Sequence, residues 1–243
     1  LSSREAVRVG LKADDVTDFM LWGLPISIIG ARLYYVLFDL PQYIADPIQI
    51  FNIRSGGLAI YGGLIAGAIT LYFFTKYHFI SLWTFLDIAA PSVLLAQLFG
   101  RWGNFMNHEA YGPDTTRSFL ESLHLPQFII DNMYIEGIYR QPTFLYESLW
   151  SLFGFILLLV LRKKPHLLKK GEVLLCYLMW YSFGRFFIEG LRTDSLYFLG
   201  VIRISQLLSA VLFVGTLILF IWRRKKGNLP DYDRSLGKNQ QII

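Results

Sequence analysis

The sequence is poor in cysteine, and it lacks the features of a secreted precursor. Cys176 is the only cysteine among 243 residues, so no disulfide can form within the chain. It lies in an apolar run, where a thiol usually behaves as a small hydrophobic side chain. The chain does not begin with Met and shows no signal-peptide pattern, so we expect it to start part-way into a longer protein.

Charged residues are also few, and apolar residues are abundant. They make up 17% and 54% of the chain, with 16% aromatic residues and a mean hydropathy of +0.42. This hydropathy is too high for a soluble domain and indicates a polytopic membrane protein. In such a protein the net charge of +5 is interpreted by its location, and it is not a sign of nucleic-acid binding.

The apolar runs predict an all-α bundle of transmembrane helices in a single membrane-embedded domain, residues 1–243. Each run is close to the ~17–25 residues that cross a bilayer as a helix. The six predicted spans are Phe19–Phe38, Gly56–Phe74, Leu82–Leu98, Thr143–Leu161, Val173–Ile188 and Ile204–Trp222. Residues 105–142 are predicted to form a small extracytoplasmic head, and residues 227–243 a mobile cytoplasmic tail.

Lys and Arg in the short loops predict the orientation. The loops after the second, fourth and sixth spans carry most of these residues, including the run Arg223–Lys226. Because such loops stay in the cytoplasm, both termini are predicted to lie on the cytoplasmic side of the membrane.

The densest cluster of polar groups is Gly100-Arg-Trp-Gly-Asn-Phe-Met-Asn-His-Glu-Ala-Tyr-Gly112, directly after an apolar run. Ionisable groups at a membrane boundary are expensive unless paired, so the cluster is a candidate site. The alternative is an interfacial anchor, with Arg101 snorkelling, Trp102 in the aromatic belt and a solvated loop behind them.

The order Gly-Arg-x-Gly-Asn-Phe-x-Asn-x-Glu-x-x-Gly in this segment resembles the signature of the prolipoprotein diacylglyceryl transferases, bacterial inner-membrane enzymes. All fixed positions are present: Arg101, Asn104, Asn107, Glu109 and Gly112 among them. The resemblance implies transfer of a diacylglyceryl group from phosphatidylglycerol to the lipobox cysteine of a prolipoprotein signal peptide, without a cofactor. It also implies seven spans, of which the first is absent from this sequence.

Two further segments match the family. One is Pro142-x-x-Leu-Tyr-Glu147, in which Glu147 could alternatively favour a helix N-terminus by charge alone. In the other, Arg185, Glu189 and Arg192 are spaced i, i+4, i+7 on one predicted helix face, with Tyr181 one turn earlier. An Arg-Glu-Arg network that only closes the span end is the alternative.

The earlier spans add two candidates. Gly63 and Gly67 are spaced for close helix packing, and the resemblance adds that this run lines the active cavity. Many members have His where this chain has Tyr61, which is a poor base at an ordinary pKa near 10. Arg32, inside the first span, should face a wet cavity or snorkel to the interface.

The chemistry assigns roles as hypotheses. Arg101 and Arg185 would stabilise the leaving phosphate, and Asn104 would hold the headgroup. Asn107, Gly112, Tyr181, Arg192, Arg32 and Glu147 complete the predicted binding residues. Glu109, Glu189 and Tyr61 are all candidates for activating the thiol.

A transporter for an anionic solute would use the same arginines. Many transporters carry repeated halves, which this sequence lacks. A structural membrane scaffold would explain the spans but not charged groups clustered on three segments.

Overall fold

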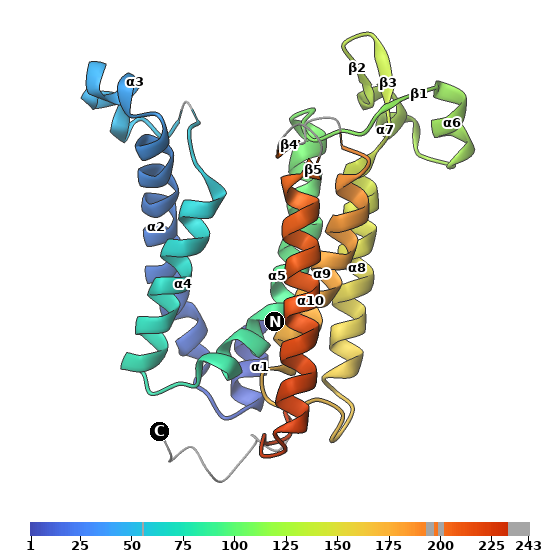
Figure 1. Cartoon of the computed structure of the whole chain (residues 1–243). Coiled ribbons are helices and arrows are strands. Elements are labelled where there is room, and N and C mark those ends of the chain that lie inside the picture. Colours follow the sequence, from blue (N-terminus) through green and yellow to red (C-terminus); the bar gives the residue numbers. More distant parts are fainter. Residues whose placement is uncertain (55, 193–196, 199–201, 233–243) are drawn as a thin grey trace. The chain divides into compact units, whose positions relative to one another are not determined.

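The computed structural model describes residues 1–54, 56–192, 197–198 and 202–232, and helices dominate it (Figure 1). The chain divides into two compact units, which are described separately. The first is Leu1–Phe85, and the second comprises the described residues of Leu86–Ser235.

The first unit is built on two long helices, α2 (Ala13–Phe38) and α4 (Ile60–Tyr77), which pack side by side (Figure 1). Its short helices are α1 (Ser2–Arg8), α3 (Leu40–Ala45) and the 3-10 helix η1 (Pro47–Phe51). A Cβ atom on Gly63 would lie 3.3 Å from the Ser27 carbonyl oxygen, and one on Gly67 would lie 2.8 Å from the Ser27 hydroxyl. The prediction that these glycines allow close helix packing is therefore confirmed.

The second unit is a helical bundle of α5 (Leu82–Met106, whose first turn belongs to the first unit), α8 (Thr143–Leu161), α9 (Glu172–Glu189) and α10 (Ile204–Lys225) (Figure 1). Trp150 on α8 and Trp180 on α9 stack with ring centroids 4.2 Å apart. Each indole N–H donates to the other residue's carbonyl oxygen over 3.0 Å. This reciprocal pair fixes the register of the two helices.

Short elements between α5 and α8 form the head. They are β1 (Asp114–Thr115), α6 (Arg117–Ser122), α7 (Gln127–Asn132), β2 (Tyr134–Ile135) and β3 (Ile138–Arg140), with antiparallel sheet order β1-β3-β2. Its core contains Leu120, Ile129 and Ile130, and it continues into Phe105 of α5 and Phe144 of α8. A second small antiparallel pair, β4 (Tyr197–Phe198) with β5 (Ile202–Arg203), precedes α10. The all-α prediction missed these strands.

In the part of the chain that the structure describes, four helices are long and apolar enough to cross a membrane: α2, α5, α8 and α10. The other two predicted spans coincide with α4 and α9, each of 18 residues. The fold is thus a helical membrane protein, and six crossings stay a prediction.

Two helix ends differ from prediction and change where the charged groups lie. Helix α5 continues beyond Leu98 to Met106, so Arg101 and Asn104 are on a helix and not in a loop. Helix α9 ends at Glu189, so Arg192 follows the helix and does not extend its face. The backbone N–H of Arg192 still donates to the Glu189 carbonyl, over 3.2 Å, and this bond turns Arg192 back toward the end of the helix.

The end of the second unit away from the head is closed by buried acids. The Asp87 carboxylate accepts the backbone N–H groups of Gly171 and Leu174, 2.5 and 2.9 Å away, and so caps α9. Glu172 is fully buried and binds Arg224 through two hydrogen bonds of 2.8 Å. Burial lowers the pKa of the neighbouring Lys170.

The start of the predicted mobile tail is ordered against this end of the bundle. Lys170 donates its backbone N–H to the Pro230 carbonyl, and Tyr232 donates to that of Leu168. Asp231 binds Lys169 at 2.5 Å and His166 at 2.8 Å. Residues up to 232 are therefore packed, and the rest of the tail lies outside the described residues.

Candidate functional site

Arginines from two segments meet at one carboxylate, that of Glu147, near the head end of the second unit. Arg101, in the last two turns of α5, contacts Glu147 in the second turn of α8, with 2.6 Å between Nη2 and Oε2. The Glu147 side chain is 9% exposed and that of Arg101 21%, so both are largely withdrawn from solvent. Glu147 therefore does more than favour the N-terminus of its own helix by charge, because it also compensates the charge of a largely buried arginine.

The other two arginines of the cluster come from α9 and the turn that follows it. Arg185 lies 3.7 Å from Glu147 Oε1 and 2.6 Å from Glu189 Oε2. Arg192 is 4.0 Å from an oxygen of each glutamate. Among the described residues, three guanidinium groups thus share two buried carboxylates.

One nitrogen of this cluster is buried without a hydrogen-bond partner. Arg185 Nη1 is inaccessible to solvent and makes no hydrogen bond with any described residue, because Glu147 is too far away for one. A buried guanidinium N–H without an acceptor is rare, so this atom marks a candidate binding position.

A hollow opens beside the cluster, between α5, α8 and α9, with about 290 Å³ of empty space, part of which is open to solvent. Arg101, Glu147 and Arg185 line it, together with the predicted Tyr181. The sequence did not single out the other five lining residues as site residues: Gln97, Trp150, Ser151, Gly184 and Ile188. Gln97 carries a signal that was available, since it is a polar residue inside an apolar run, four positions before Arg101.

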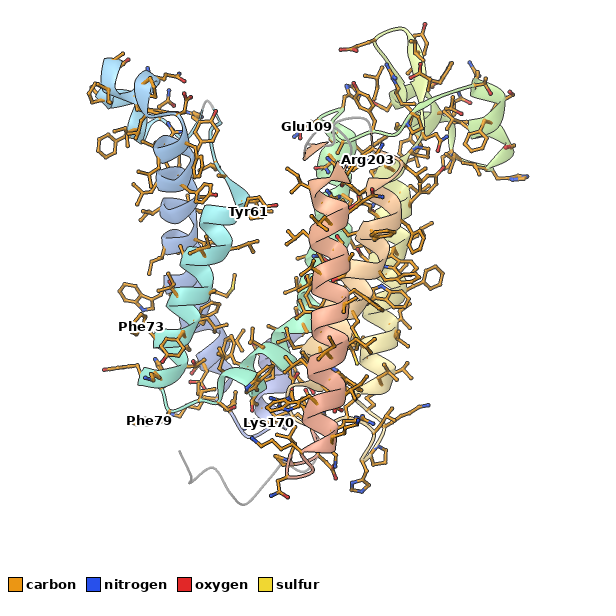
Figure 2. All side chains as sticks on the ribbon, in the orientation of Figure 1. Tyr61, Phe73, Phe79, Glu109, Lys170 and Arg203 are labelled. Carbon is orange, nitrogen blue, oxygen red and sulfur yellow. The ribbon has the colours of Figure 1, made fainter. Side chains whose placement is uncertain are left out.

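Other residues of the signature surround a second, smaller hollow under the head. It has about 200 Å³ of empty space, and Asn104, His108 and Glu109 line it with aromatic side chains. Figure 2 shows Glu109 and Arg203 at the head end of this unit and Lys170 at the other end.

The last two signature residues lie in the chain that leaves α5. Asn107 is exposed in the turn after the helix. Gly112 is buried, and its N–H donates to the Gln141 carbonyl. A Cβ atom there would lie 2.9 Å from the Gln141 side chain, so Gly112 allows the entry and exit of the head to pair closely.

Arg32 and Tyr61 belong to the first unit. The buried Arg32 guanidinium donates to the carbonyls of Gln49, Ile50, Gly56 and Gly57. Gly57 has φ +75°, and a Cβ atom there would collide with Arg32. Arg32 thus organises the loop after α3. Tyr61 is half exposed in the first turn of α4 (Figure 2).

The family model described as prolipoprotein diacylglyceryl transferase matches residues 1–222. The chain belongs to this family. It is 68% identical to the phosphatidylglycerol–prolipoprotein diacylglyceryl transferase of Enterococcus faecalis, covering 99% of this chain and 86% of that protein. Proteins of the same name from Limosilactobacillus reuteri (55% identity, 98% and 86% covered) and Streptococcus suis (56%, 96% and 85%) are also similar.

The family and the transferase class predicted from the sequence are thereby confirmed. Membership and the apolar helices together make the chain a multi-pass bacterial membrane protein. The roles of individual site residues stay predictions, and they are taken up next.

Proposed function

We propose that this protein transfers the diacylglyceryl group of phosphatidylglycerol to the lipobox cysteine thiol of prolipoproteins, the first step of lipoprotein maturation. The observation that carries the proposal is the arginine cluster beside the 290 Å³ hollow, with Arg185 Nη1 unsatisfied. Guanidinium groups match phosphate oxygens in geometry and charge.

The reaction makes one bond and breaks one. The cysteine sulfur bonds to the glyceryl carbon, and the bond from that carbon to the phosphate oxygen breaks. The electron pair stays with glycerol 1-phosphate, whose negative charge increases as it leaves. Arg101 and Arg185 would stabilise this developing charge more strongly than the bound lipid, which is the condition for catalysis.

The thiol must lose its proton in the same reaction. Glu189 is 2% exposed and contacts Arg185 at 2.6 Å, so we assign it the positioning of that arginine. Glu109 and Tyr61 are then the candidates for taking the proton. In the assay below, a loss of transfer in Glu109→Gln but not in Tyr61→Phe would assign the proton to Glu109, and the converse would assign it to Tyr61.

The proposed orientation places the head and the arginine cluster outside the cytoplasm, with the basic loops and the C-terminus inside. Helix α10 carries Arg223, Arg224 and Lys225 in its last turn, at the opposite end of the bundle from the head (Figure 1). A secreted precursor with its lipobox cysteine at the outer face would then meet the head and the second hollow first.

Transfer to a synthetic lipobox peptide tests the proposal. Purified protein in micelles with phosphatidylglycerol should add one diacylglyceryl mass to the peptide, but not to a peptide with Ser in place of Cys. Arg101→Ala and Arg185→Ala should each lower the rate by about 10²-fold or more, the cost of removing a donor to developing charge. Arg117→Ala is the matched control, because this arginine is exposed in the head and pairs only with Glu121 among the described ion pairs. Full activity in Arg101→Ala or Arg185→Ala would refute the phosphate-binding role.

A further inference from the structure

Gln97 is a polar side chain in the wall of the 290 Å³ hollow. It lies on α5, in the apolar run Pro91–Phe99, and precedes Arg101 by four residues. Residues four apart lie on the same face of a helix, about 5–6 Å from each other. Gln97 and Arg101 therefore line the same hollow, with Gln97 one turn deeper toward the middle of α5.

The nitrogen and the oxygen of the Gln97 side-chain amide differ in their hydrogen bonding. Nε2 donates a hydrogen bond to the hydroxyl of Tyr177 on α9, over 3.0 Å. Oε1 is buried and has no hydrogen-bond partner among the described residues. Leaving a buried carbonyl oxygen unsatisfied costs about 1–3 kcal/mol, and native structures rarely do so without a functional reason. The bond to Tyr177 holds the amide in place and keeps this oxygen available.

The missing partner must be a hydrogen-bond donor. An ionised phosphodiester cannot fill this role, since its oxygens only accept. The glycerol headgroup of phosphatidylglycerol carries two hydroxyl groups, a few bonds away from its phosphate. With the phosphate at Arg101 and Arg185, a hydroxyl group can reach one helical turn, ~5.4 Å, along α5.

We propose that Gln97 Oε1 accepts a hydrogen bond from a glycerol hydroxyl of phosphatidylglycerol and so selects this lipid among anionic phospholipids. The inference rests on the proposed function. It makes Gln97 a specificity-determining residue: the arginines bind any phosphodiester, and Gln97 recognises what is attached to it. A site built to bind a hydroxyl rejects an analogue without one, because its own polar group is then left unpaired.

The test compares phosphatidylglycerol with phosphatidylpropanol, which keeps the phosphodiester and the three headgroup carbons but lacks both hydroxyls. The full-length protein is assayed with the cysteine peptide, and kcat/KM is measured for each lipid. The wild type should prefer phosphatidylglycerol by about tenfold, the value of one hydrogen bond of ~1.4 kcal/mol. In Gln97→Met this ratio should fall to about one, with only the phosphatidylglycerol rate reduced.

Gln206→Met is the matched control. Gln206 belongs to the same bundle and donates to the Phe186 carbonyl, but it does not line the hollow, so the ratio should stay at the wild-type value. Should Gln97→Met fail to fold, Gln97→Asn replaces it, because the shorter side chain withdraws the carbonyl and should also lower the ratio.

The outcomes separate the inference from the proposed function. An unchanged ratio in the Gln97 variants, or an equal loss with both lipids, would overturn the role of Gln97 while leaving the transferase intact. No transfer by the wild type from either lipid would overturn the proposed function itself.

Discussion

Glu147 is a single carboxylate shared by three arginines, and its position defines the charge of the site. Its oxygens lie 2.6, 3.7 and 4.0 Å from nitrogens of Arg101, Arg185 and Arg192. A bound phosphodiester would compete with Glu147 for the same donors. The carboxylate thus keeps the arginines together when no lipid is bound.

Replacing Glu147 with Gln should therefore destabilise the protein. Breaking a buried ion pair costs up to about 3–5 kcal/mol, because the partner charges lose their compensation. We expect a lower thermal unfolding midpoint in micelles, and partial recovery on adding glycerol 1-phosphate, which supplies the missing negative charge. Glu121→Gln is the control, since its pair with Arg117 is half exposed and contributes little. An unaltered midpoint in Glu147→Gln would contradict this account.

Arg32 shows how a residue type alone leaves its role open. The sequence allowed a wet cavity or snorkelling, because an arginine in an apolar run has few other options. In the structure the Arg32 side chain donates hydrogen bonds to four main-chain carbonyls in the segment after α3. Such a set needs the planar fork of an arginine, which a lysine cannot reproduce.

The contact between helices α8 and α9 is built from a repeated pattern. Trp150 and Gly154 on α8 face Trp180 and Gly184 on α9, so each tryptophan lies over the glycine of the opposite helix. The two glycines leave the space that the indole rings fill. The contact also positions the site, since Trp150 and Gly184 both line the hollow.

An alanine at Gly184 should disrupt this contact. Its Cβ atom would overlap the Trp150 ring, and overpacking of this kind typically costs about 1–3 kcal/mol. Gly215→Ala on α10 is the matched control, because a Cβ atom there meets nothing within 4 Å and alanine favours a helix by about 1 kcal/mol. Thermal unfolding in micelles should show a lower midpoint for Gly184→Ala only. Equal thermal midpoints for the two variants would show that the stacked Trp150 and Trp180 rings shift to make room for the added methyl group without loss of stability.

The sequence predicted the long helices well, because length and hydropathy alone determine a membrane helix. It also singled out charged residues on three segments, and in the structure arginines of two of these segments meet Glu147 of the third. It could not pair Arg101 with Glu147, which are far apart in the chain and meet only through tertiary packing. Nor did it predict the strands of the head, each two or three residues long and too short for an alternating pattern. Gln97 is polar inside an apolar run, but the buried Oε1 atom without a partner among the described residues, on which its proposed role depends, can be found only in the structure.

In the second unit, charged side chains gather at both ends of the helical bundle. The head end carries the arginine cluster, and the other end carries the basic loops with Asp87, Glu172 and Asp231 among them. Hydrogen bonds from Lys169 and then His166 lower the pKa of Asp231 from its usual 3.8 to about 2. The ordered start of the tail is thereby tied to the loop before α9.

This contact should depend on pH in a defined direction. The pKa of Asp231 is lower in the folded state than in the unfolded state, so its contribution is complete above about pH 4 and is lost as the pH falls toward 2. Asp231→Asn should lower the thermal midpoint at neutral pH, and the difference from the wild type should shrink in this acid range. A constant difference at all pH values would exclude the ionised carboxylate as its source.

The chain enters and leaves the head through two adjacent segments, and the core of the head also packs onto Phe105 and Phe144 of the bundle. Gly112 and Gln141 are hydrogen-bonded where the chain enters and leaves, as are Gln141 and Pro113 and the Thr143 hydroxyl with the Ala110 carbonyl. A segment whose two ends touch can take insertions at its exposed turns without moving the helices that carry it. The head can therefore be enlarged at these turns, while the arginine cluster keeps its place in the bundle.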